Sequence, residues 1–150
     1  MIKTAAKVEV AIVGSGPAGL SAGCHAAAIG LSHVLLEKSD HASDTIYKFQ
    51  KGKYVMATPD VLPLRSDIPF AMGSREDVLA NWNSALVTNN VNIRYNAEVK
   101  SITGSRGAFE LTLISGEVIA AETVVLAIGL QGNLNTLQIP GAQASTHLQY

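Results

Sequence analysis

The sequence predicts an α/β fold: a parallel sheet of about four strands, with helices on one side and a three-stranded antiparallel β-meander on the other. Three observations predict it. Two apolar runs, Val8–Val13 and residues 33–37, enclose a glycine turn and an alanine-rich helix. A series of short β runs separated by glycine-containing turns follows later in the chain. The apolar run 123–128 then closes the pattern.

The composition is that of one domain with its own hydrophobic core. The chain has 150 residues, of which 47% are hydrophobic and 15% charged, a balance that argues against intrinsic disorder. The net charge is −1 and there is no long basic run, so we expect no nucleic-acid partner. The four histidines are scattered and lie beside no cysteine pair, so we expect no metal site.

Cysteine usage and hydropathy favour a cytoplasmic protein. Cys24 is the sole cysteine, which excludes an internal disulfide and fits a reducing compartment. Glu9 and the glycine cluster after it interrupt any apolar core of a signal peptide. The apolar stretch at 124–130 is too short to span a bilayer, so we expect no membrane association.

The first 37 residues read as a β-α-β unit. The run Val8–Val13 has the apolar, β-branched character of a strand buried on both faces. The turn G-S-G-P-A-G follows at once, and the alanine-rich helix after it ends at Gly30. Residues 33–37 form the second strand, and the crossover is expected to be right-handed. Within the helix, Cys24 is expected to be a small buried side chain and His25 to lie at the surface.

The middle of the chain is irregular and then helical. Residues 40–70 lack clean periodicity, and we expect this segment to be functional or partly helical. Ser74 resembles a helix N-cap followed by acidic residues, and Asn89 and Asn90 end the helix. Trp82 lies on the apolar stripe of this helix and is expected to be a core anchor.

The last third of the chain is rich in strand signals. Residues 91–95 predict a third parallel strand. Three further β runs with glycine-containing turns between them predict the meander: 97–103, 108–114 and 117–121. Residues 123–128 then show the pattern of a separate, buried parallel strand that ends at Gly129.

The glycine turn predicts a dinucleotide site. Gly14 permits the tight turn, Gly16 lets the backbone approach a pyrophosphate, and Gly19 lets the helix pack closely on the sheet. Pro17 suits the first helical turn, whose free N–H groups attract phosphate. Glu37, at the end of the next strand, can accept hydrogen bonds from the ribose hydroxyls and would repel a 2′-phosphate. FAD or NAD is therefore expected here rather than NADP.

These motifs together resemble the FAD domain of the two-dinucleotide-binding-domain flavoproteins, and the resemblance covers nearly the whole chain. It implies a Rossmann-like FAD-binding domain. The segment T-V-V-L-A-I-G at 123–129 is similar to the family's T-h-h-h-A-T-G near the flavin, with Ile128 in place of the usual threonine. Val99 lies where the family's backbone groups meet the adenine. The predicted cofactor-binding residues are Gly14, Ser15, Gly16, Pro17, Ala18, Gly19, Glu37, Lys38, Val99, Ala127 and Gly129.

Cysteine positions narrow the branch of the family. Residues 38–70 contain no cysteine, unlike the glutathione-reductase, peroxidase and coenzyme-A-disulfide branches. The chain is most similar to the thioredoxin-reductase-like branch, which includes ferredoxin–NADP reductases and bacillithiol-disulfide-reductase-like proteins. In that branch a segment like L-Q-I-P-G-A-Q leads into an NAD(P)H-binding domain. We therefore expect residues 1–150 to be the FAD-binding part of a longer flavoprotein, which the resemblance implies is a homodimer.

The resemblance implies electron transfer from NAD(P)H through FAD to a disulfide, a ferredoxin or another acceptor. Two alternatives stay open: a flavin monooxygenase or oxidase, and a non-catalytic dinucleotide-binding regulatory module. No acid, base or nucleophile stands out as catalytic in residues 1–150, and this part alone is expected to be inactive. Gln50, Lys51 and Tyr54 of the irregular segment are candidates to approach the isoalloxazine ring.

Overall fold

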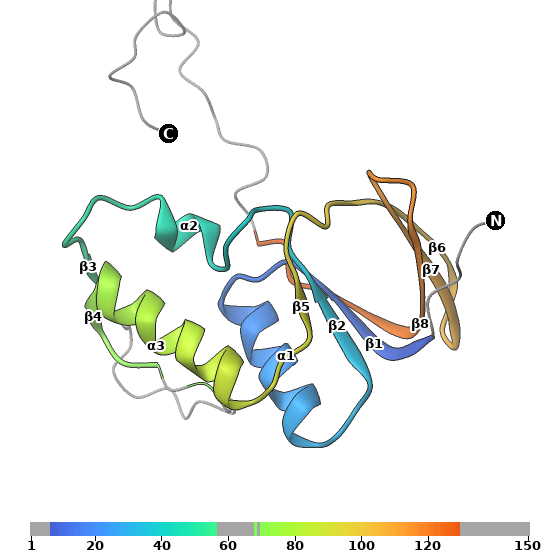
Figure 1. Cartoon of the computed structure of the whole chain (residues 1–150), viewed down its shortest axis with the longest axis horizontal. Helices are drawn as coiled ribbons and strands as arrows, with labels where there is room; N and C mark the ends of the chain where they lie inside the picture. Colours follow the sequence, from blue (N-terminus) through green and yellow to red (C-terminus); the bar gives the residue numbers. More distant parts are fainter. Residues whose placement is uncertain (1–6, 57–67, 69, 130–150) are drawn as a thin grey trace, which may run out of the picture.

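A computed structural model describes residues 7–56, 68 and 70–129 (Figure 1). The fold is built on a six-stranded sheet with the strand order β5-β2-β1-β8-β7-β6, and β3 and β4 form a second, two-stranded sheet. The elements in chain order are β1 (Val8–Val13), α1 (Pro17–Ala28), β2 (His33–Leu36), α2 (Asp44–Tyr47), β3 (Tyr54–Val55), β4 (Gly73–Ser74), α3 (Arg75–Thr88), β5 (Ile93–Arg94), β6 (Val99–Ser105), β7 (Ala108–Leu113) and β8 (Val118–Leu126).

Four strands of the sheet are parallel, as predicted. β1 lies between β2 and β8, and β5 extends the sheet beyond β2. The register places Ala11 of β1 opposite Val34 of β2 and Val124 of β8. Because β1 is interior to the sheet, its carboxyl end lies between those of its two neighbours, where open α/β sheets bind ligands.

Helices α1 and α3 cover one face of the parallel strands (Figure 1). Their apolar side chains form one core with Ile12 and Leu35 of the sheet. Trp82 of α3 is 3% exposed and lies 6.0 Å from Phe70, ring centre to ring centre. Cys24 of α1 is fully buried. The predicted core positions of Trp82 and Cys24 are therefore confirmed.

Both long helices begin and end at the residues that the sequence indicates. Pro17 occupies the first turn of α1, and Gly30 follows its end with φ +74°. Ser74 caps α3 by accepting a hydrogen bond from the Asp77 N–H at 3.2 Å. Asn90, just past the end of α3, adopts a left-handed conformation with φ +53°, which asparagine tolerates better than most residues.

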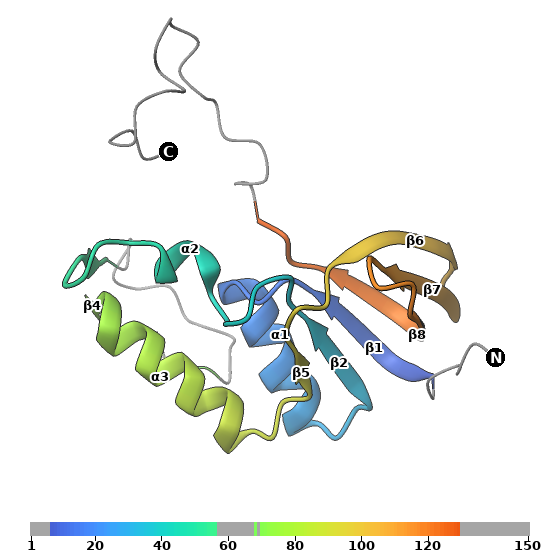
Figure 2. The same cartoon turned by 45° about the horizontal axis from the view of Figure 1, so that its top comes forward.

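The antiparallel part of the sheet lies against the face of the parallel strands opposite α1 and α3 (Figure 2). Leu111 and Leu113 of β7 and Ile119 of β8 pack against Ala11 and Leu36 of the parallel strands. An ion pair fastens this layer to the far edge of the sheet: Arg94 of β5 bonds to both carboxylate oxygens of Glu117, at 2.8 and 2.6 Å.

The predicted division between the third meander strand and the last parallel strand is wrong. Residues 117–121 and 123–128 were expected to be two strands, but β8 runs without a break from Val118 to Leu126. Its first part pairs antiparallel with β7 and its second part pairs parallel with β1. Its end is not buried either, since Leu126 is 63% exposed and Ile128, beyond the strand, is 68% exposed.

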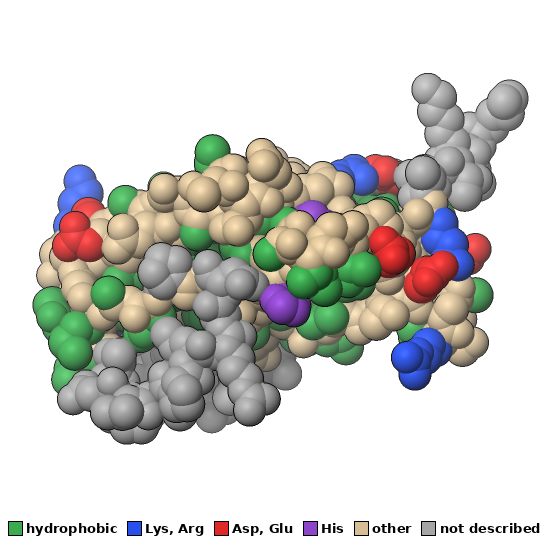
Figure 3. Space-filling model, turned by 90° about the horizontal axis from the view of Figure 1, so that it is seen from below, with side chains coloured by type: hydrophobic (Ala, Val, Ile, Leu, Met, Phe, Trp, Pro, Cys, Tyr) green, Lys and Arg blue, Asp and Glu red, His purple; other side chains and the backbone are tan. Residues whose placement is uncertain are grey.

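The irregular segment 40–70 is partly helical, as expected, because it contains α2 and then β3 in its described part. None of the helices within residues 7–56 and 70–129 is long and apolar enough to cross a membrane. Within those same ranges, no group of three or more His, Cys, Asp or Glu side chains is placed to hold a metal ion. On the face seen from below, most described charged side chains lie toward the two ends, with hydrophobic side chains between them (Figure 3).

Candidate functional site: the glycine turn and Glu37

The glycine turn lies at the carboxyl end of β1, where the strand passes into α1. Gly14 has φ +98°, and its N–H donates to the Leu36 carbonyl of β2 at 2.8 Å. A Cβ on Gly14 would lie 2.6 Å from the Ala127 carbonyl oxygen. Both its conformation and its close neighbour therefore require glycine at this position.

The other two glycines differ sharply in what surrounds them. A Cβ on Gly19 would lie 1.8 Å from the Gly14 carbonyl oxygen, so α1 approaches the turn too closely for any side chain. A Cβ on Gly16 would meet no protein atom within 4 Å, and its φ of −69° suits any residue. Neither the conformation nor the packing of the protein requires glycine at position 16. The remaining reason for a glycine at position 16 is the close approach of a ligand to this backbone.

The start of α1 is suited to an anion. Gly16 is the N-cap residue and provides no side chain, Pro17 has no N–H, and the first helical bond runs from the Leu20 N–H to the Gly16 carbonyl at 2.9 Å. The amides of Ala18 and Gly19 therefore precede the regular hydrogen-bond ladder. No acidic residue lies in the first turn of α1. The positive end of the helix dipole is left without a carboxylate of its own, as a phosphate site needs.

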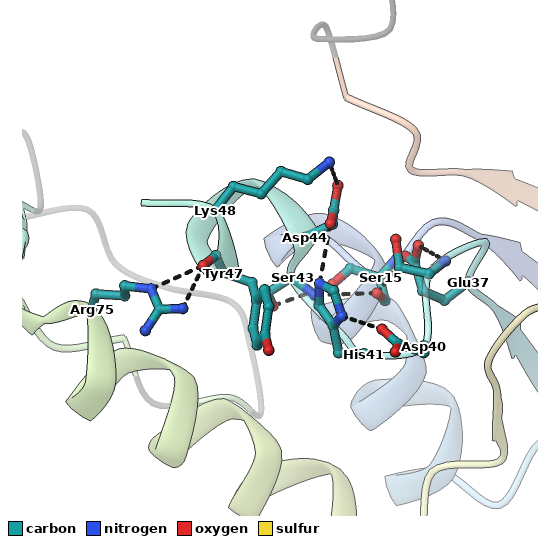
Figure 4. A network of polar contacts seen from close by, with 10 residues as sticks. Ser15, Glu37, Asp40, His41, Ser43, Asp44, Tyr47, Lys48 and Arg75 are labelled. Atoms are coloured by element: carbon teal, nitrogen blue, oxygen red, sulfur yellow. Dashed lines mark hydrogen bonds and ion pairs between the residues drawn. The ribbon is translucent and has the colours of Figure 1, made fainter. Parts of the chain in front are cut away.

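Glu37 points into this turn from the end of β2 (Figure 4). Its Oε2 atom accepts hydrogen bonds from the Ser15 N–H at 2.9 Å and from the Ser15 hydroxyl at 2.5 Å. Its Oε1 atom accepts one from the Ser39 N–H at 2.9 Å. Burial raises the pKa of Glu37, but the hydrogen bonds from Ser15 and Ser39 outweigh burial and hold that pKa below 4.5. The carboxylate is therefore charged at neutral pH, in the state that accepts hydroxyl groups.

Ser15, one of the predicted cofactor-binding residues, is fully buried. Its carbonyl accepts hydrogen bonds from the Ser43 N–H at 3.1 Å and the Ser43 hydroxyl at 3.4 Å. Ser43 directly precedes α2 and adopts a left-handed conformation with φ +60°, which is costly for serine. The segment before α2 is thus attached directly to the glycine turn, and nothing in the sequence pattern indicated this contact.

A polar network continues from Ser43 across α2 (Figure 4). The two His41 ring nitrogens lie 2.5 Å from Asp40 and 3.1 Å from Asp44, and the ring stacks on Tyr47 with ring centres 3.7 Å apart. Burial raises the pKa of Asp44, but contacts with Lys48 and His41 outweigh burial and hold that pKa below its ordinary value. These interactions stabilise the 40–48 segment internally, and the bonds from Ser43 to Ser15 attach it to the glycine turn. Asp44 and Lys48, at i, i+4 spacing, are a local sequence signal for part of this network.

The segment after β5 lies beside Glu37. The Ala97 N–H donates to the Glu37 carbonyl at 2.8 Å, and Asn96 donates to Ser39 at 3.0 Å. Burial and the negative charge of Glu37 raise the pKa of the Tyr95 hydroxyl. Val99 follows as the partly buried first residue of β6. The region predicted to meet the adenine is therefore close to the predicted ribose acid.

Residues 127–129 complete the group at the carboxyl edge. The Ala127 N–H donates to Val13 at 2.8 Å, which places Ala127 beside the end of β1. Gly129 has φ +67°. The structure thus brings together the predicted residues from β1, β2 and β8.

Four other candidates lie elsewhere or face solvent. Gln50, Lys51 and Tyr54 are exposed on the turn before β3 and on β3 itself, whose neighbour is the start of α3 rather than the glycine turn (Figure 1). Lys38 is exposed beside Glu37. Roles for these four side chains stay predictions.

A separate shallow pocket of about 630 Å³ lies between the end of α3, β5 and the segment before α2. Leu86 and Ile93 contribute apolar side chains to its lining, and Asp40, Asn90 and Tyr95 contribute polar ones. The lining contains neither Glu37 nor any residue of the glycine turn. It lacks the features that bind a pyrophosphate, so we do not assign it to the cofactor.

The family can now be assigned. A family model described as pyridine nucleotide-disulphide oxidoreductase matches residues 11–150. The chain belongs to this family. The resemblance drawn from the glycine turn, Glu37 and the meander is thereby confirmed.

Individual relatives of this oxidoreductase domain are longer proteins. It is 28% identical over 140 residues to indole-3-pyruvate monooxygenase YUCCA1 of Oryza sativa subsp. japonica, a match that covers 88% of this chain and 34% of that protein. It is similar to the bacillithiol disulfide reductase Bdr (YpdA) of Staphylococcus aureus, with a TM-score of 0.77 and 26% identity, covering 91% of this chain and 43% of the other. It is also similar to a ferredoxin-flavin thioredoxin reductase of Clostridium acetobutylicum, with a TM-score of 0.65 and 25% identity. This match covers 87% of this chain and 40% of the other. The chain therefore spans well under half the length of these relatives.

Proposed function

We propose that residues 1–150 are the FAD-binding part of an NAD(P)H-dependent flavoprotein oxidoreductase. The observation that carries the proposal is the open space at the Cβ position of Gly16, in a turn where Gly14 and Gly19 have no such space. A glycine that the protein itself does not need marks where a ligand approaches the backbone. Family membership supports a pyridine-nucleotide oxidoreductase as the class of enzyme.

In this proposal each part of the site has one task. The amides of Gly16, Ala18 and Gly19 bind the pyrophosphate at the positive end of α1. Glu37 accepts a ribose hydroxyl, and the backbone of Val99 meets the adenine. Ala127 and Gly129 lie on the flavin side, and Lys38 borders the adenosine. When bound, FAD supplies the redox chemistry by taking electrons from NAD(P)H and passing them on.

For the electron acceptor, we propose a disulfide or a ferredoxin-linked protein. Support comes from the bacillithiol disulfide reductase and the ferredoxin-flavin thioredoxin reductase, both at least 25% identical to this chain. A monooxygenase is the second candidate, and the 28% identity with the Oryza sativa enzyme favours it. Stoichiometric oxygen consumption with NADPH by the full protein, dependent on an organic substrate, would support the second candidate. Oxygen-independent reduction of a disulfide or ferredoxin would support the first. A cytoplasmic location is proposed with the reductase, because the sole cysteine is a buried thiol.

FAD titration followed by flavin absorbance tests the site. Gly16→Ala is expected to weaken FAD binding at least about tenfold, or about 1.4 kcal/mol, because its methyl group occupies the space that the pyrophosphate needs. Glu37→Ala is expected to weaken it by a similar factor through loss of the ribose contact.

Two matched controls accompany these variants. Gly73→Ala adds a methyl group in β4 at an ordinary contact distance of 3.5 Å from Asp77, and Glu110→Ala removes an exposed carboxylate from β7. Both are expected to bind FAD like the wild-type chain. Absence of FAD binding by the wild-type chain would contradict the proposed function. Equal affinity of all five proteins would show that the site lies elsewhere.

A further inference from the structure

The side chain of Ser15 points inward, although it belongs to the glycine turn. It is fully buried, and its hydroxyl donates to Glu37 Oε2 at 2.5 Å. Its own N–H donates to the same oxygen at 2.9 Å, and its carbonyl accepts from Ser43. Both donors of Ser15 are therefore engaged with a carboxylate inside the protein, whereas a phosphate ligand would need them free.

This arrangement makes the two oxygens of Glu37 unequal (Figure 4). A carboxylate oxygen accepts about two hydrogen bonds, so the two bonds from Ser15 fill Oε2. Oε1 accepts one bond, from the Ser39 N–H at 2.9 Å, and has capacity for one more. Glu37 is only 6% exposed, which limits the directions from which a hydroxyl can reach it.

We propose that the Ser15 hydroxyl is a positioning group for ribose recognition: it occupies Oε2 of Glu37 and holds the carboxylate so that Oε1 alone accepts a ribose hydroxyl. This inference rests on the proposed function, because it concerns the ribose of the same dinucleotide. Ser15 acts through Glu37 and does not touch the cofactor.

The arrangement has a consequence for pH dependence. The hydrogen bonds from Ser15 and Ser39 keep the pKa of Glu37 low against the effect of burial. Loss of the Ser15 hydroxyl raises that pKa, so Glu37 takes up a proton at a higher pH and ceases to be a pure acceptor. The charged side chains of Lys38 and Asp40, on the segment that follows Glu37, are exposed to solvent. Tyr95 is the titratable side chain that senses Glu37 from the β5 side, and it is neutral over the acidic range.

The test measures FAD affinity of the 150-residue chain between about pH 3 and pH 7, a range that includes the titration of a carboxyl group with a lowered pKa. Ser15→Ala is expected to bind FAD about tenfold more weakly at neutral pH, a loss of the size that one charge-assisted hydrogen bond carries. As the pH falls, its affinity for FAD is expected to decline at a higher pH than the affinity of the wild-type chain. This decline is the acid limb of the pH profile. Ser15→Thr keeps the hydroxyl and is expected to restore the wild-type pH profile.

Ser43→Ala is the matched control. It removes a hydroxyl that is also buried, at 2% exposure, and that bonds to Ser15 rather than to Glu37. It is expected to retain the wild-type pH profile, whatever its effect on stability. If Ser43→Ala shifts the acid limb as far as Ser15→Ala does, the effect is a loosening of the turn and the inference is wrong.

The remaining outcomes also decide the question. An acid limb of Ser15→Ala that coincides with that of the wild-type chain overturns the role of Ser15 while FAD binding itself stands. If Ser15→Ala does not fold, Ser15→Cys replaces it, because a thiol has a similar volume and donates only weakly. An unshifted limb for that variant overturns the inference in the same way. Failure of the wild-type chain to bind FAD overturns the proposed function, and this inference with it.

Discussion

A methyl group added to Gly19 collides with the backbone of the glycine turn. The Cβ atom would lie 1.8 Å from the Gly14 carbonyl oxygen, roughly 1.5 Å short of an ordinary van der Waals contact. The backbone of Gly14 cannot easily move away, because its N–H is hydrogen-bonded to Leu36 and it packs against Ala127. Relief therefore requires α1 to move away from the sheet, which loosens the contact of Leu20 and Cys24 with the core.

We expect Gly19→Ala to lower the free energy of unfolding by about 3 kcal/mol, the upper part of the usual range for overpacking. For a domain of this length, such a loss lowers the melting temperature by about 6–12 °C. Gly16→Ala is the matched comparison, because its Cβ meets no protein atom within 4 Å. It is expected to lose no more than about 1 kcal/mol, from the weaker capping of α1 by alanine.

Thermal unfolding followed by circular dichroism, without added FAD, measures both variants. Gly19→Ala is expected to unfold several degrees below Gly16→Ala. Equal melting temperatures for the two variants would show that Gly16 and Gly19 have no distinct structural roles.

Three further predictions follow from the ion pair, the core and the buried acid. Arg94→Met breaks the partly exposed pair with Glu117 and is expected to cost about 1 kcal/mol or less, with a small fall in melting temperature that vanishes in concentrated salt. Trp82→Ala removes the largest buried ring and is expected to cost about 3–5 kcal/mol in urea unfolding; a cost below about 1 kcal/mol would contradict its core role. The pKa of Glu37 is lowered by folding, so its contribution to stability is present above pH 4.5 and is lost as the pH falls through the folded value. The difference in melting temperature between the wild-type chain and Glu37→Ala should therefore shrink in acid, and a constant difference from neutral pH to about pH 3 would show that the charge is not involved.

Much of the fold follows from local signals. Each strand and helix of the β-α-β unit is indicated by residues within a few positions of one another. The same is true of the caps of α1 and α3 and of the core position of Trp82. These are the features that periodicity and capping residues describe well.

The continuity of β8 could not be read in the same way. Glu122 interrupts the apolar pattern and resembles a boundary between two strands, but it lies in the middle of one. It is exposed and forms an ion pair with Lys7 at 2.9 Å, while its carbonyl accepts from Gly107. Only the long-range pairing with β7 and β1 makes the strand continuous, and that pairing has no local signature.

The site shows the same division. The glycine turn and Glu37 were identified because their spacing follows from the β-α-β geometry itself. The contact of Ser15 with Ser43 joins residues 28 positions apart in the chain. It also involves a left-handed conformation of Ser43, which the residue type does not indicate. Residue type is the only local signal at Gln50, Lys51 and Tyr54, and the structure places their segment beside the start of α3.

Binding of FAD at the glycine turn is tested directly by an amide chemical-shift map of the ¹⁵N-labelled chain during titration with FAD. Binding at this turn predicts that the largest shifts belong to the N–H groups of Gly16, Ala18 and Gly19, while Gly52 and Gly107 stay unchanged. Largest shifts at Asn83 and Asn90, in the pocket beside α3, with the amides at the start of α1 unaffected, would contradict it.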